Sequence, residues 1–170
     1  MKRFLAVLAI VLVVSTGSLW AQDAPKAEVY GGFSMVNISD SGFKTTPFGW
    51  AASANFNVNE MFGIVADTSG NYRDGNKFHS ILGGVQLTHR VAKTSAFFQA
   101  KTGFLHTNDT SDNNHFQVGF GGGADWNVND KVAIRLIQVD WLPTKETGAA
   151  TGWVKNVTRA SAGVVFKVTK

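Results

Sequence analysis

The charged residues that could build an ionic site are few and lie far apart along the chain. Seven of them share one face of the alternating segments described below: Glu28, Asp67, Lys101, Asp125, Arg135, Arg159 and Lys167. Acids and bases on one enclosed face have to pair, because an unpaired buried charge is strongly destabilising. The set predicts either a plug of buried ion pairs or a path for protons or ions, and the plug is favoured. Strand adjacency predicts that Glu28 and Asp125 join Arg135 and Arg159, with Asp67 and Lys101 as outer members.

No other group of residues predicts catalysis or metal binding. The four histidines, each near the end of a predicted strand, are His79, His89, His106 and His115. His106 and His115 flank a loop with acids at 109 and 112, but this spacing is not specific to metal-binding sites. His79 and Ser80 are adjacent, so in a strand they point to opposite faces and cannot form a hydrolase pair. We therefore expect no catalytic residue, no metal and no cofactor.

The N-terminus predicts export. Met1-Lys2-Arg3 is basic, residues 4–14 are apolar, and Ser15 to Ala21 is a small, polar-tending stretch. This order is typical of a signal peptide, here residues 1–21, with Ala24 as an alternative cleavage site. The apolar run is too short for a membrane-spanning helix, which needs about 20 residues. Residues 22–170 then form one domain.

Composition favours a membrane barrel over a soluble domain. Charged residues make up 16% of the chain, whereas about a quarter is usual, and there are 18 glycines and no cysteine. Removing Lys2 and Arg3 with the signal peptide lowers the net charge from +4 to about +2. That charge is too small and too dispersed to predict nucleic-acid binding.

The remaining chain is built of segments with period-2 alternation and almost no helical pattern. The eight predicted strands are residues 28–38, 47–58, 61–72, 78–89, 95–106, 115–128, 131–142 and 156–169. Short polar turns (57–60, 90–94 and 127–130) alternate with longer connections (39–46, 73–77, 107–114 and 143–155). Short turns at one end and long loops at the other are typical of outer-membrane barrels.

The strands over 47–58, 61–72, 115–128 and 156–169 each separate an apolar face from a small, polar or charged one. In the second strand Phe48, Trp50 and Phe56 share a face, opposite Ser53 and Asn55. The strand over 131–142 departs from this pattern, because Ile134 and Leu136 share parity with Gln138 and Asp140. A bulge near Ile137 would restore the alternation, or the upper part of this strand lies outside the hydrocarbon layer.

Aromatic residues gather near both ends of the predicted strands. Near the short turns they are Phe56, Phe62, Phe98, Trp126 and Phe166. Near the long loops they are Trp50, Tyr72, Phe78, Phe116 and Trp141. Two such rings are typical of interfacial girdles in a membrane barrel, and ordinary core aromatics are the alternative.

Together these features predict an all-β fold, an eight-stranded antiparallel transmembrane up-and-down β-barrel. The chain resembles the small outer-membrane β-barrel family. The resemblance lies in the order and spacing of Val29-Tyr30-Gly31-Gly32-Phe33, residues 120–125, residues 135–140 and Ala162-Gly163-Val164-Val165-Phe166. That family includes the membrane domain of outer-membrane protein A and the X-type porin-like proteins. The resemblance implies no catalytic residue. Its members usually end on an aromatic residue that the barrel assembly machinery reads, whereas this chain continues to Lys170 after Phe166.

We expect a non-enzymatic outer-membrane protein with a structural or surface-contact role. Its expected partners are outer-membrane lipid and, during biogenesis, the assembly machinery, and we expect a monomer. A narrow ion or solute pore is the first alternative. A secreted soluble barrel that binds a small apolar ligand is the second.

Overall fold

The computed structural model describes residues 24–40, 43–73, 75–108, 112–145 and 152–168. The predicted signal peptide, residues 1–21, lies outside the described residues. Within the described ranges no helix has the length and apolarity needed to cross a membrane. The regular elements in these ranges are all β-strands.

Eight long strands form the wall of the molecule. They are β1 (Ala27–Asp40), β3 (Phe48–Asn57), β4 (Phe62–Arg73), β5 (Asn76–Val91), β6 (Thr94–Asn108), β7 (Asp112–Asn127), β8 (Val132–Trp141) and β11 (Val157–Val168). Three short strands lie at one end, β2 (Phe43–Thr45), β9 (Thr144–Lys145) and β10 (Trp153–Val154). The short strands pair with β1, with β7 and with β9, respectively.

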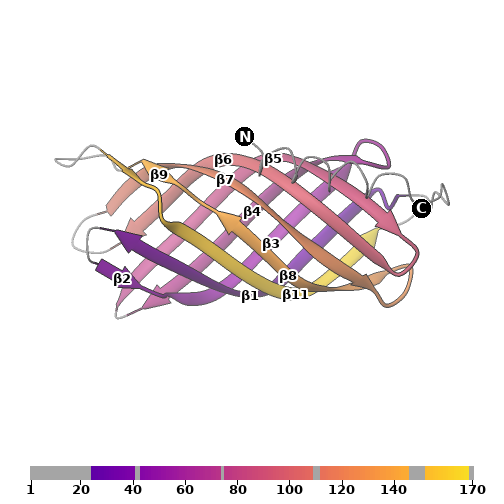
Figure 1. Cartoon of the computed structure of the whole chain (residues 1–170), viewed down its shortest axis with the longest axis horizontal. Helices are drawn as coiled ribbons and strands as arrows, with labels where there is room; N and C mark the ends of the chain where they lie inside the picture. The colour runs from indigo at the N-terminus through magenta and orange to yellow at the C-terminus, as the bar shows by residue number, and fades with distance from the viewer. Residues whose placement is uncertain (1–23, 41–42, 74, 109–111, 146–151, 169–170) are drawn as a thin grey trace, which may run out of the picture.

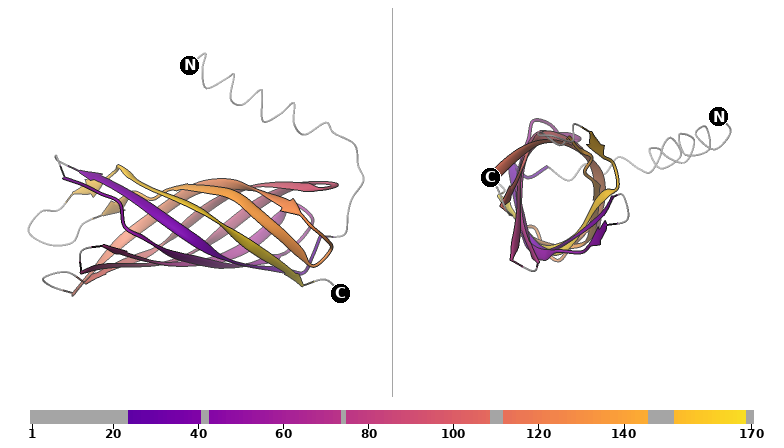
Figure 2. Two further views of the ribbon diagram at one scale, coloured as in Figure 1. Left: turned by 90° about the horizontal axis from the view of Figure 1, so that it is seen from below. Right: turned by 90° about the vertical axis from the view of Figure 1, so that its left-hand side faces the viewer.

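The long strands close into an antiparallel barrel. Each pairs with its sequence neighbour, and β1 pairs with β11 from Ala27 opposite Val168 to Ile38 opposite Val157. Figure 1 shows the strands strongly tilted along a long cylinder, and the right-hand view of Figure 2 looks along it through a closed ring. Closure leaves the long strands without a free edge inside the wall, so their backbone groups bond to one another. The predicted fold class is confirmed.

One end of the barrel carries three short turns, and we call it the turn end. Asn59 and Asn129 occupy equivalent places in two of them, within Asn-Val-Asn-Glu and Asn-Val-Asn-Asp. The Asn59 side chain accepts hydrogen bonds from the backbone N–H groups of residues 61 and 62, and Asn129 does the same for 131 and 132. These side-chain turns explain why a short Asn-rich sequence is enough to reverse the chain.

The opposite end, the loop end, differs from the prediction. Residues 73–77 were expected to form a long loop, but Arg73 pairs with Asn76 and the strands almost meet. The strands of the next hairpin also continue further than expected, to Asn108 and from Asp112. Polar residues outside an apolar band can remain in a strand, because the ladder still satisfies their backbone groups. Parts of the other two predicted loops form β2, β9 and β10.

A bulge in β8 explains the parity break in that strand. Ala124 pairs with Ile137, but the next residue, Asp125, pairs with Arg135, so Leu136 has no counterpart on β7. Leu136 and Ile137 are consecutive and both exposed on the outer wall. The extra residue returns Gln138 and Asp140 to the inner face, and Val139 and Trp141 to the outer one. The predicted bulge near Ile137 is confirmed.

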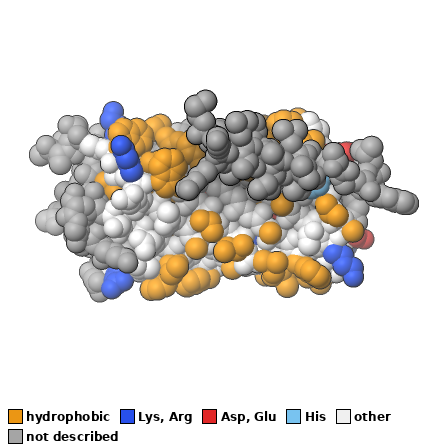
Figure 3. Space-filling model, viewed as in Figure 1, with side chains coloured by type: hydrophobic (Ala, Val, Ile, Leu, Met, Phe, Trp, Pro, Cys, Tyr) orange, Lys and Arg blue, Asp and Glu red, His pale blue; other side chains and the backbone are white. Residues whose placement is uncertain are grey.

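The barrel is polar inside and apolar outside. Buried side chains include many Ser, Asn, Gln, Asp and Arg residues, whereas large apolar side chains such as Phe33, Ile81 and Phe104 are more than half exposed. In Figure 3 apolar side chains run along the flank, and Lys and Arg side chains lie towards the two ends. A soluble domain would bury its apolar side chains, so this distribution requires an apolar environment around the wall.

Candidate functional site

The centre of the barrel holds a four-membered ionic cluster, formed by Asp67 of β4, Lys101 of β6, Asp140 of β8 and Arg159 of β11. Arg159 Nη2 lies 2.8 Å from Asp67 Oδ2 and 2.7 Å from Asp140 Oδ2. Lys101 Nζ lies 3.3 Å from Asp67 Oδ2 and 3.1 Å from Asp140 Oδ1. Each cation therefore contacts both carboxylates, and two positive charges balance two negative ones. We call this group the central cluster.

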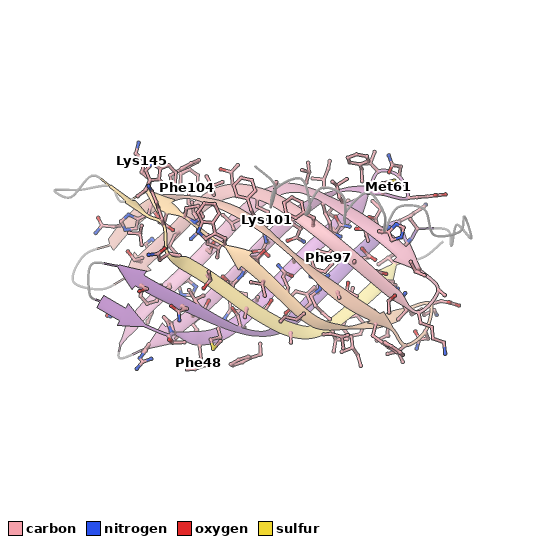
Figure 4. All side chains as sticks on the ribbon, in the orientation of Figure 1. Phe48, Met61, Phe97, Lys101, Phe104 and Lys145 are labelled. Carbon is pink, nitrogen blue, oxygen red and sulfur yellow. The ribbon has the colours of Figure 1, made fainter. Side chains whose placement is uncertain are left out.

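Alternation along the four strands brings these side chains together. They come from separate parts of the sequence, and the tilt of the strands (Figure 1) brings them to one level inside the barrel, where they contact one another. Asp140 pairs directly with Arg159 across β8 and β11, and the β8 bulge is what turns Asp140 inward. Figure 4 labels Lys101 among the side chains in the middle of the barrel, and Phe48 and Phe104 at its outer edges.

A second ion pair lies next to the central cluster, towards the turn end. Arg135 donates from Nε to Asp125 Oδ1 at 2.8 Å and from Nη2 to Asp125 Oδ2 at 3.1 Å. This two-point geometry matches a guanidinium to a carboxylate. The Arg135 guanidinium also lies 4.5 Å from the ring centre of Tyr30 and 4.1 Å from that of Phe97, both inward-facing. The cation is therefore held by charge and by two aromatic faces.

Glutamine side chains connect the two ionic groups. Gln138 accepts from Arg135 Nη1 at 2.7 Å and donates to Asp140 Oδ2 at 2.8 Å. It also donates to Gln99, which donates to Gln86 at 2.6 Å. These bonds join the central cluster and the Arg135–Asp125 pair into one polar network.

At the turn end a further polar group surrounds Glu28. This carboxylate lies 3.2 Å from Arg90 Nη2 and accepts a hydrogen bond from Asn55 at 3.3 Å. Lys167, half-buried, donates to the side chain of Asn127 in the same region.

Towards the loop end an apolar group lies among the polar side chains of the interior. Val36, Leu82, Leu142 and Val157 pack together there and are buried. A cavity of about 20 Å³ lies beside them, lined also by Asn71 and Gln117, with space for a water molecule rather than an organic ligand. This apolar group and the central cluster fill successive levels of the lumen.

The structure places all seven charged residues predicted for the lumen inside the barrel, but two expected pairings are wrong. We expected Glu28 and Asp125 to join Arg135 and Arg159, with Asp67 and Lys101 as outer members. Instead Arg159 contacts Asp67 and Asp140, and Glu28 contacts Arg90. The sequence prediction also missed two members, because Asp140 followed the broken parity of its strand and Arg90 was assigned to a turn.

The predicted girdle residues face outward. Trp50, Phe56, Phe62, Tyr72, Phe98, Trp126, Trp141 and Phe166 are each between 42% and 58% exposed. Phe78 was expected in the same set and is not, because it lines the interior cavity beside Asn71 and Ser80. Among the described residues no group of three or more His, Cys, Asp or Glu side chains could hold a metal ion.

Solved structures with the same architecture are known. The crystal structure of Neisserial surface protein A matches with a TM-score of 0.64 at 18% identity, over 86% of this chain and 99% of that one. The chain has the fold of a small outer-membrane β-barrel. Ail, the attachment invasion locus protein of Yersinia pestis, solved with the heparin analogue sucrose octasulfate, matches with a TM-score of 0.54 at 12% identity, over 84% of this chain and 98% of that one.

A designed transmembrane β-barrel matches as well, with a TM-score of 0.52 at 15% identity, over 87% of this chain and all of that one, 100%. No protein-family model and no curated sequence matches the chain. At these identities the similarity concerns the fold, and it agrees with the resemblance inferred from the sequence motifs.

Proposed function

We propose that this protein is an integral outer-membrane barrel with a closed lumen, whose role is structural or lies in contacts made by its loop end. The observation that carries the proposal is the inverted distribution of side chains, with apolar residues outside and a paired ionic network inside. Lipid covers the outer wall, and the aromatic residues at both ends lie at the two interfaces.

The filled lumen favours a structural role over conduction. Arg159, Gln99, Gln138 and Asp140 are each less than 2% exposed, although they point into the barrel. A continuous aqueous pore would expose the side chains that line it to water. An eight-stranded barrel is also just wide enough for side chains to fill it.

The loop end supports a contact role. Beyond Phe104 and Phe116, β6 and β7 continue as a polar hairpin through Thr107 and Asn113. This polar part of the wall would project out of the lipid, where it is available to molecules at the cell surface. Ail, with the same fold, was solved with a heparin analogue, so sulfated sugars are a first class of ligand to test here.

Two measurements test the proposal. Refolded protein should migrate differently on SDS gels before and after boiling, because a closed ladder has no edge from which to open. In planar bilayers the same protein should show negligible conductance. Recovery in the soluble fraction with one mobility would refute membrane insertion, and robust salt-dependent channels would refute the closed lumen.

A further inference from the structure

A polar patch interrupts the apolar outer wall near the loop end, around Gly70 of β4. Trp50 of β3 and His79 of β5 lie directly opposite Gly70 on its two sides. A Cβ atom on Gly70 would lie 2.8 Å from Trp50 Nε1 and 2.8 Å from the Tyr72 hydroxyl. Because Gly70 has no side chain, both rings lean over it and their polar atoms converge.

The same patch contains a cation and an imidazole. Lys77 lies opposite Tyr72 in the ladder and is exposed. The Tyr72 and His79 rings meet edge to face, with centroids 5.5 Å apart. An indole N–H, a phenol O–H, an imidazole and an ammonium group thus share one small area of the outer wall. We call Trp50, Gly70, Tyr72, Lys77 and His79 the Gly70 cluster.

Directly towards the middle of the barrel the wall becomes apolar. Ile81 follows His79 by two residues on the same face of β5 and is 70% exposed. Phe33, opposite Trp50 in the ladder, is 58% exposed. Hydrogen-bond donors and a cation above an apolar surface match an amphiphile with an anionic head and an acyl chain.

We propose that the Gly70 cluster binds the phosphate group of an anionic lipid in the leaflet at the loop end. Lys77 supplies the charge, Trp50 Nε1 and the Tyr72 hydroxyl donate to phosphate oxygens, and the acyl chains lie over Ile81 and Phe33. The apolar surface beneath the cluster favours a lipid over free phosphate. This inference rests on the proposed membrane insertion, since the cluster meets headgroups only if the wall is in lipid.

Lipid retention tests the site. The protein is refolded in phosphatidylcholine vesicles that contain a minor fraction of phosphatidylglycerol, and the lipids kept after mild detergent extraction are counted by native mass spectrometry. Wild-type protein should retain phosphatidylglycerol above its share of the vesicle. A cation at the membrane surface contributes about a fivefold factor in affinity for anionic lipid, so Lys77→Gln with His79→Gln should lose about fivefold or more of that enrichment.

Two further variants separate the site from general charge. Lys145→Gln removes an exposed cation at the same end of the barrel, beside Phe116 and Trp153, and should leave the enrichment unchanged. Gly70→Ala keeps every charge but pushes the Trp50 and Tyr72 polar atoms aside, so it should reduce the enrichment. The shift in gel mobility on boiling, measured for each variant, shows that the barrel is folded.

The outcomes are distinct. Folded, inserted wild-type protein that keeps the two lipids in their vesicle ratio would overturn the site and leave the proposed function standing. Failure to insert would refute the proposed function itself. An equal loss in Lys145→Gln would show general attraction instead of a site, and displacement of the lipid by inorganic phosphate would show an anion site without lipid selectivity. Either result overturns the inference.

Discussion

Arg159→Ala is the most informative perturbation of the interior. Arg159 is fully buried and makes three hydrogen bonds, one from Nε and one from Nη2 to Asp140 and one from Nη2 to Asp67. Without it, two buried carboxylates share the single charge of Lys101. Removing one partner of a buried ion pair costs about 3–5 kcal/mol, because a charge remains uncompensated.

This free energy corresponds to roughly two to three and a half orders of magnitude in the unfolding equilibrium, at about 1.4 kcal/mol for each factor of ten. Urea unfolding of the vesicle-inserted protein should therefore give a much lower midpoint at a similar slope. Lys93→Ala, in an exposed turn, is the matched control and should change stability by less than about 0.5 kcal/mol.

A second substitution tests the cause of the loss. Adding Asp67→Asn to Arg159→Ala removes the uncompensated charge, so the double variant should be more stable than Arg159→Ala alone. An Arg159→Ala protein within about 0.5 kcal/mol of wild type would refute the reasoning. It would mean that water reaches the central cluster and solvates the free carboxylate.

Three further predictions concern the wall. Val164→Arg places a charge in lipid and should cost about 2–4 kcal/mol near the midplane, whereas Val164→Leu should be nearly neutral; equal urea midpoints for the two would mean the face is not in lipid. Deleting Ile137 removes the β8 bulge but keeps Asp140 inward, so the gel shift on boiling should survive. Deleting Val139 turns Asp140 outward and should abolish the gel shift. Identical behaviour of the two deletions would contradict the bulge. Gly121→Val would press a side chain against Asp140 and should cost about 1–3 kcal/mol in urea unfolding, and an unchanged midpoint would show that the strand can move aside.

Alternation was sufficient to predict the architecture of this protein. A strand has a side-chain period of two, so sequence alone shows which residues share a face. Apolar-faced strands joined alternately by short turns and longer connections predict an outer-membrane barrel. The inward position of Asp67, Lys101 and Arg159 follows from the same rule. The Asn-rich turns could also be predicted, because Asn59 and Asn129 stabilise their turns through contacts two and three residues along the chain.

Only the tertiary structure decided which charges meet. Arg159 contacts Asp67 across 92 residues of sequence, and that contact depends on the height of each residue in a tilted barrel. The height of a residue along the barrel axis depends on the strand tilt and on the register of all eight strand pairs. Alternation within one strand shows which face a residue occupies, but not its height. The inward turn of Asp140 likewise depends on where β7 and β11 accommodate the extra residue of β8. Parity is a local property of one strand, whereas pairing inside the lumen is a property of the closed ring.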